Sequence, residues 1–126
     1  EFKMLQEVPK GSELLILGGA GDSFIANFGN KFNEYDYQRT KKSISVKYLG
    51  SETQKKYLND SVDSRHNFEY RVIPQVFSGV TNITIFKNHA IVIYLFDENT
   101  TSIVIRNKKI VESYEGFFES LWGLGK

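Results

Sequence analysis

Histidine is the residue type best suited to proton transfer or metal binding near neutral pH, and this chain of 126 residues has two histidines and no cysteine. Without cysteine there is no thiolate nucleophile, no disulfide and no thiolate zinc ligand. His66 follows Asp60 and Asp63, but this spacing matches no metal-ligand pattern, and we expect no metal site. His89 lies in a short polar turn, outside any recognisable nucleophile motif. These residues predict neither a metal centre nor a catalytic group.

A glycine-rich turn is the next candidate. Residues 18–23 read Gly-Gly-Ala-Gly-Asp-Ser, between an apolar run and a stretch of helical periodicity, where a phosphate-binding loop would lie. Phe24 occupies the place of the third glycine of the dinucleotide fingerprint, and the lysine of a P-loop is missing. A tight structural turn is the favoured interpretation, with a loop that binds a polar ligand as the alternative. Arg39, Lys41 and Lys42 are likewise interpreted as a solvated helix end, with phosphate contact as the alternative.

Composition limits the class of protein. Hydrophobic residues make up 40% and charged residues 25% of the sequence, as in ordinary globular domains. The formal net charge of +1 gives no electrostatic reason for direct nucleic-acid binding, and no apolar run reaches the roughly 20 residues that cross a bilayer. We therefore expect a cytoplasmic protein with no cofactor and no membrane contact. Residues 1–126 are expected to form one domain cut from a longer chain, with residues 1–10 as the end of an upstream helix or linker.

Hydrophobic periodicity predicts the elements that position these residues. Apolar alternation or continuous β-branched runs predict six strands, at residues 13–17, 44–49, 68–73, 82–86, 90–96 and 101–105. Helical spacing predicts a helix over residues 24–35, a short one opening at the capping box of residues 51–54, and a last one over residues 110–122 with Asn107 as N-cap and Gly123 as terminator. The predicted order is β-α-β-α-β-β-β-β-α.

This order predicts an α/β fold, a mixed β-sheet sandwiched by helices. The run from Ala90 to Phe96 is apolar without alternation, so we expect it at the centre of the sheet with both faces covered. Its neighbours at residues 82–86 and 101–105 carry Asn, Thr and Ser between Ile and Val residues. They are predicted to lie nearer an edge or beside a cleft.

Five short pieces follow one another in a recognisable order: Glu13-Leu-Leu-Ile-Leu-Gly-Gly, Tyr37-Gln-Arg-Thr-Lys-Lys-Ser-Ile-Ser-Val-Lys-Tyr-Leu49, Tyr70-Arg-Val-Ile-Pro74, Asn82-Ile-Thr-Ile-Phe and Phe117-Phe-Glu-Ser-Leu-Trp122. Together, from about residue 1 to residue 122, they resemble the phospholipase D-like domain that follows the winged helix in TrmB-like transcriptional regulators of archaea and some bacteria. The resemblance implies a phospholipase D-like half and a homodimer. It also implies that DNA is bound only through a winged-helix domain upstream of Glu1.

Active enzymes of the phospholipase D type carry His-x-Lys-x-x-x-x-Asp on the strand and turn where the stretch from Asn82 to His89 falls here. In three registers the His and Lys positions fall on Val80 and Asn82, on Thr81 and Ile83, or on Asn82 and Thr84. None of these supplies a histidine nucleophile with its lysine. The resemblance therefore implies the regulator branch of the family, with no catalytic residues.

A vacant active-site strand is predicted to have become a pocket for a small polar ligand. Asn82 and Thr84 point the same way because strand side chains alternate, and Arg71 on the preceding strand is expected to add a charged donor nearby. Asp22 and Ser23 would close the rim. Such groups suit a metabolite such as a sugar, held by hydrogen bonds. The alternative is that Asn82 and Thr84 only satisfy backbone groups near a sheet edge.

The sequence thus predicts a non-catalytic effector-sensing or dimerisation domain of a TrmB-like transcriptional regulator. Two other classes stay open. One is a diverged phosphodiesterase or nucleotide-binding enzyme that uses the glycine turn, and the other is a protein-interaction module without a ligand. A winged helix upstream of Glu1 in the full-length gene would favour the regulator.

Overall fold

A computed structural model describes residues 2–18, 37–51, 67–73, 81–95 and 101–125. The elements with assigned bounds are α1 (Phe2–Glu7), β1 (Glu13–Gly18), β2 (Ser45–Ser51), β3 (Phe68–Ile73), β4 (Thr81–Phe86), β5 (Ala90–Leu95), β6 (Thr101–Ile105) and α5 (Lys108–Leu124). Residues 37–41 are also helical. The predicted helix at 24–35, the predicted helix from residue 51 and the turn with Asp22 and Ser23 lie outside the described residues. Within those ranges, no helix is both long and apolar enough to cross a membrane.

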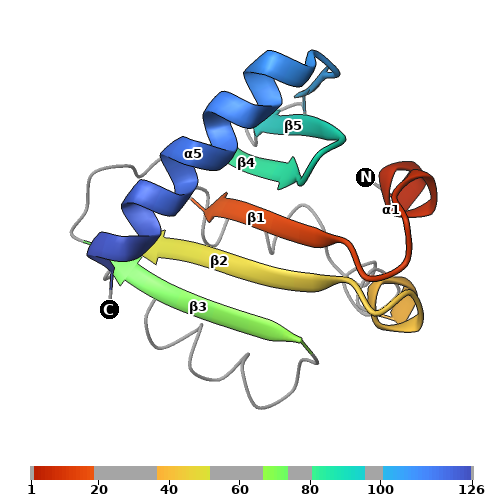
Figure 1. Ribbon diagram of the computed structural model, residues 1–126, viewed down its shortest axis with the longest axis horizontal. Helices are drawn as coiled ribbons and strands as arrows, with labels where there is room; N and C mark the ends of the chain where they lie inside the picture. The colour runs from red at the N-terminus through yellow and green to blue at the C-terminus, as the bar shows by residue number, and fades with distance from the viewer. Residues whose placement is uncertain (1, 19–36, 52–66, 74–80, 96–100, 126) are drawn as a thin grey trace.

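The six strands form one mixed sheet in the order β3-β2-β1-β4-β5-β6 (Figure 1). β1, β2 and β3 are parallel, whereas β4 is antiparallel to β1 and the pairing stays antiparallel through β5 and β6. A tight turn joins β4 to β5: His89 N donates to Phe86 O at 2.8 Å, and Asn88 has a φ of 66°. Asn adopts this left-handed conformation more readily than most residues. All six predicted strands are present.

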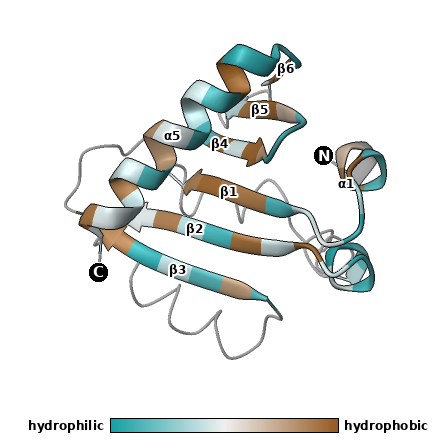
Figure 2. Cartoon of the chain, in the orientation of Figure 1, coloured by the Kyte–Doolittle hydropathy of each residue, from teal (hydrophilic) through white to brown (hydrophobic). Residues whose placement is uncertain are grey.

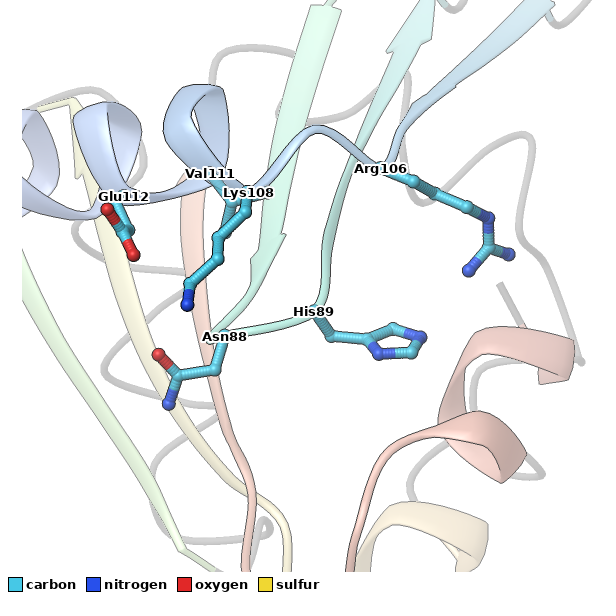
Figure 3. Close-up of a pocket in the computed structure, with 6 residues that line it drawn as sticks. All are labelled: Asn88, His89, Arg106, Lys108, Val111 and Glu112. Carbon is cyan, nitrogen blue, oxygen red and sulfur yellow. The ribbon is translucent and has the colours of Figure 1, made fainter.

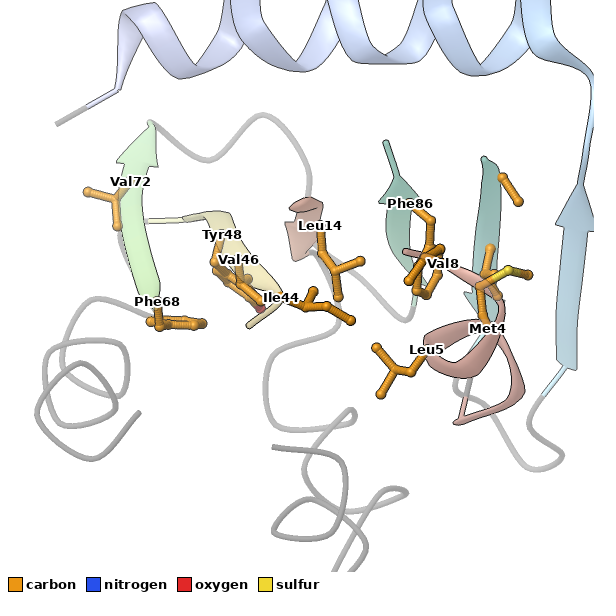
Figure 4. Close-up of a cluster of buried hydrophobic side chains, with 12 residues drawn as sticks. Met4, Leu5, Val8, Leu14, Ile44, Val46, Tyr48, Phe68, Val72 and Phe86 are labelled. Atoms are coloured by element: carbon orange, nitrogen blue, oxygen red, sulfur yellow. The ribbon is translucent and has the colours of Figure 1, made fainter. Parts of the chain in front are cut away.

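The sheet has two apolar faces because strand side chains alternate. On one of them, the α1 face, Met4, Leu5 and Val8 pack against strand side chains, on the side opposite to α5 (Figure 4). On the other, the α5 face, three residues of the last helix are buried against the strands: Val111, Phe118 and Trp122. Burying one such side chain is worth about 1.5–3 kcal/mol. The predicted fold class, a mixed α/β sheet with helices on both faces, is confirmed.

The start of α5 agrees with the sequence and its end does not. The Asn107 side chain accepts a hydrogen bond from Ile110 N at 3.1 Å, as an N-cap does. The helix then continues through Gly123 and ends at Leu124, and Gly125 N donates to Trp122 O at 3.2 Å. A glycine costs a helix about 1 kcal/mol. Packing of the last turn on the sheet outweighs that cost, because Trp122 is buried there.

The predicted place of the most apolar strand is wrong. β1 and β4 are the middle pair of the sheet, β5 is second from one edge, and β6 is the edge strand. β5 is nonetheless covered on both faces, since Ile91 belongs to the α5-face cluster and Val92 to the α1-face cluster. The helices therefore cover strands outside the central pair of the sheet. An apolar run without alternation therefore shows that a strand is covered, and leaves its place in the sheet open.

Candidate functional site

A row of hydroxyl and amide side chains crosses the α1 face of the sheet. The pairings of the strands place Tyr48 beside Tyr70, Asn82 beside Tyr94, and Tyr94 beside Ser102. We call these five residues the polar row. It passes the carboxyl end of β1, which runs parallel to β2 and β3. In α/β sheets, ligands bind at the carboxyl ends of parallel strands.

Gly18, the last residue of β1, lies between Tyr48 and Asn82 in the polar row. It pairs with Asn82 on β4, and a Cβ at position 18 would overlap the hydroxyl group of Tyr48. Only a residue without a side chain leaves room for the phenol of Tyr48 over the end of β1. The glycine that ends the apolar run therefore positions Tyr48, and its role is separate from that of the turn that follows.

Asn82 and Thr84 point to the α1 face together, as predicted. Asn82 is 1% exposed and Thr84 is 3% exposed. Burying an amide or a hydroxyl group is costly without a hydrogen-bond partner. Two such groups next to each other on an interior strand therefore mark the polar part of an otherwise apolar face.

Arg71 is not part of this site, which corrects the predicted grouping. It pairs with Leu49, a residue of the α5-face cluster, so its side chain lies on the other side of the sheet. Arg71 Nη1 donates to Trp122 O at 2.7 Å, and its guanidinium carbon lies 4.7 Å from the centre of the Trp122 ring. Asp22 and Ser23, the other predicted rim residues, lie outside the described residues. Of the five predicted residues, the structure brings together Asn82 and Thr84.

A cavity of about 190 Å³ adjoins the polar row. It lies between α1 and the last two strands and is lined by Met4, Glu7, Val92, Tyr94, Ser102, Val104 and Arg106. Arg106 Nη2 lies 3.1 Å from Glu7 Oε2, an ion pair that links the lining of the cavity to α1. The tyrosines of this region were missed from sequence. Tyr48 could have been found from its alternation with Ile44 and Val46, whereas Tyr94 is hidden in an apolar run.

His89 lines a second cavity, of about 140 Å³, between the β4–β5 turn and the start of α5 (Figure 3). Asn88, Arg106, Lys108, Val111 and Glu112 line it as well. The imidazole extends away from Lys108 and Glu112, and its Nε2 has no hydrogen-bond partner in the part of the chain that the structure describes. Among those same residues, no group of three His, Cys, Asp or Glu side chains could hold a metal ion. A positioned nucleophile–base pair, as covalent catalysis requires, is not observed around His89 within the described ranges.

The basic cluster before β2 has a structural role that neither predicted interpretation foresaw. Arg39 is 1% exposed, and its Nη1 donates to Ile44 O at 2.8 Å. Lys42 Nζ donates to Leu5 O at 2.7 Å and to Gln6 O at 3.1 Å, at the carboxyl end of α1. Carbonyl groups there have no partner within the helix, and a cation suits the helix dipole. The two side chains therefore hold backbone segments together, and Lys41 is the exposed member.

Comparison with known proteins places the fold. No protein-family model and no curated protein matches the sequence. Among solved structures, the fold is similar to that of TrmBL2, an archaeal chromatin protein whose structure shows a novel mode of DNA binding. The TM-score is 0.61 at 18% sequence identity, over 95% of this chain. The chain spans 43% of the length of the TrmBL2 chain, and at this identity the likeness shows a shared fold.

Proposed function

We propose that this chain is a non-catalytic, effector-sensing and dimerising domain of a TrmB-like regulator that acts on DNA. The observation that carries the proposal is the fold shared with TrmBL2, a DNA-binding chromatin protein, over 95% of this chain. The sequence pieces that resemble the phospholipase D-like domain of such regulators agree with it. In this proposal the domain is one part of a longer regulator, and a winged helix elsewhere in that protein binds the DNA.

The effector is a small, uncharged polar metabolite such as a sugar. The polar row offers three phenols, an amide and a hydroxyl group, and two of its members, Tyr94 and Ser102, line the 190 Å³ cavity. Neutral donors and acceptors beside aromatic rings suit hydroxyl-rich ligands, because the rings pack on the apolar face of a sugar while the polar atoms fix its orientation. The cavity is several times the roughly 30 Å³ that one water occupies in the liquid.

The same arrangement supports a role without catalysis. The strand where enzymes of the phospholipase D type carry His-x-Lys presents Asn82 and Thr84, an amide and a hydroxyl group that can hydrogen-bond a ligand but do not supply a histidine nucleophile with its lysine. A bound effector would stabilise the conformation that holds it, and binding to DNA would change only if the two conformations differ in DNA affinity.

The test is a thermal-shift screen of sugars and other polar metabolites, with variants of the polar row. Tyr94→Phe removes one hydroxyl group and keeps the ring, and Ser102→Ala removes a second. We expect a stabilising compound whose affinity falls at least fivefold in each variant. Tyr114→Phe is the matched control, since Tyr114 packs with the α5-face cluster, and it should bind as the unmodified chain does. The absence of any stabilising compound, or a hit that both variants bind unchanged, contradicts the effector role.

A further inference from the structure

We infer that β6 and the exposed flank of α5 form a symmetric interface with a second copy of this chain. This inference deepens the proposed dimerisation by naming its surface, and it does not depend on the effector. We call the three exposed apolar residues on the α5 face of this region the β6 surface: Ile103, Ile110 and Phe117.

β6 lies at the edge of the described sheet, and its own sequence carries none of the usual protection. It is the last strand of the sheet, and its central residues are exposed: Ile103 by 54% and Val104 by 47%. Natural edge strands avoid pairing with other chains through charged residues, proline or bulges. Residues 101–105 read Thr-Ser-Ile-Val-Ile, with no charge and no proline, and pair with β5 without a bulge. No strand among the described residues pairs with the outer edge of β6, and an edge strand between apolar side chains is a template for another strand.

α5 extends this apolar surface on one flank only. Phe117 is 52% exposed and Ile110 is 40% exposed. They are seven residues apart, so they lie on the same side of the helix, and the ring of Phe117 stacks on that of Tyr114 at 6.4 Å. The opposite flank carries the exposed residues Glu112 and Glu119. In Figure 2 brown apolar and teal hydrophilic segments accordingly alternate along the helix.

A second copy fits β6 because the strand is complementary to itself. Antiparallel pairing about a two-fold axis at Ile103 sets Ile103 opposite Ile103, Ser102 opposite Val104, and Thr101 opposite Ile105. No charged residue meets another in these five positions, and a net charge of +1 per chain adds little repulsion. Such an isologous contact satisfies both copies equally and closes the assembly at two chains. The contact requires only the same strand of a second copy of this chain.

The same symmetry brings α5 into the contact. A two-fold axis normal to the sheet continues the sheet into the second copy and leaves both α5 helices on the same face. Two residues, 106 and 107, separate β6 from α5, so the helix starts beside the end of the edge strand. The apolar flank with Ile110 and Phe117 then extends the buried area beyond the strand pair, which alone spans about 17 Å at 3.4 Å per residue.

Cysteine cross-linking tests this arrangement directly, because the chain contains no cysteine of its own. Opposed antiparallel residues have Cα atoms about 4.5–5.5 Å apart, within the range that a disulfide spans. Ile103→Cys, which lies on the proposed axis, should form a cross-linked dimer on mild oxidation. Thr101→Cys is the matched control, because the two copies of residue 101 would be roughly four residue steps, about 13 Å, apart. It should stay uncross-linked.

Sedimentation or light scattering supplies the second measurement. Ile103→Lys and Phe117→Lys should each weaken dimerisation at least tenfold, with a circular dichroism spectrum like that of the unmodified chain. Tyr37→Lys and Glu119→Lys place the same side chain at exposed positions outside the β6 surface and should leave the dimer intact. A dimer that survives both Ile103→Lys and Phe117→Lys, without cross-linking at position 103, overturns this surface and leaves dimerisation standing. A chain that remains monomeric at about 100 μM overturns both the β6 surface and the proposed dimerisation. The effector role is judged separately, by the thermal-shift screen.

Discussion

The guanidinium carbon of Arg71 lies 4.7 Å from the centre of the Trp122 ring, and Arg71 Nη1 donates to the carbonyl oxygen of Trp122 at 2.7 Å. One side chain of β3 thus contacts both the ring and the backbone of the last turn of α5. A cation at the carboxyl end of a helix is favoured by the helix dipole, and an arginine stacks well on indole. Arg71, predicted as a charged donor of the ligand site, instead holds α5 against the other face of the sheet.

Trp122→Ala is expected to reduce the free energy of unfolding by about 3–5 kcal/mol. Trp122 is 7% exposed, and the centres of its ring and the Phe118 ring lie 5.7 Å apart. Truncation therefore leaves a cavity and removes the aromatic ring on which Arg71 stacks. Chemical denaturation measures the change. Glu119→Ala, on the exposed side of the same helix, should shift stability by less than about 0.5 kcal/mol. Equal effects of the two substitutions would contradict this account.

Gly18→Ala is expected to destabilise the chain by about 1–3 kcal/mol, as overpacking does. The added methyl group would overlap the ring and the hydroxyl group of Tyr48, so the Tyr48 side chain has to move. The reverse combination is informative: with Tyr48→Ala already in place, Gly18→Ala should cost little. Additive losses in the double variant, measured by thermal or urea unfolding, would show that the strain at position 18 has another source.

Lys42→Met is expected to lower stability by about 1–3 kcal/mol, because carbonyl groups at the end of α1 lose a charged donor. Lys41→Met is the matched control, since Lys41 is the exposed neighbour and should be nearly neutral. Urea unfolding of both variants measures the difference. If Lys41→Met costs as much as Lys42→Met, then loss of charge, rather than loss of the bonds to α1, explains the effect.

The chain is expected to hydrolyse no generic phosphodiester. Covalent catalysis needs a nucleophile with a positioned partner, and no register of residues 80–89 supplies a histidine with its lysine. A chromogenic phosphodiester assay with the unmodified chain and with His89→Ala should show the same background rate. Turnover that disappears in His89→Ala would instead support the diverged phosphodiesterase.

Local sequence determined the elements of this protein. The period-two and period-3.6 apolar patterns, together with Asn107 as a cap, predicted all six strands and the last helix, because these signals act between residues that are neighbours in the chain. The same alternation placed Asn82 and Thr84 on one face. The end of α5 at Leu124 could not be read in this way, since burial of Trp122 against the sheet decides it.

Tertiary structure alone decided the rest, because strand order and facing depend on pairing between distant segments. No local sequence signal shows that β1 lies between β2 and β4. This order makes β4 an interior strand and places Gly18 beside Asn82, with the phenol of Tyr48 over Gly18. Nor does the sequence state which face a strand turns to its neighbours, and a shift of one residue reverses every side chain. That choice separated Arg71 from Asn82 and left β6 exposed at the edge.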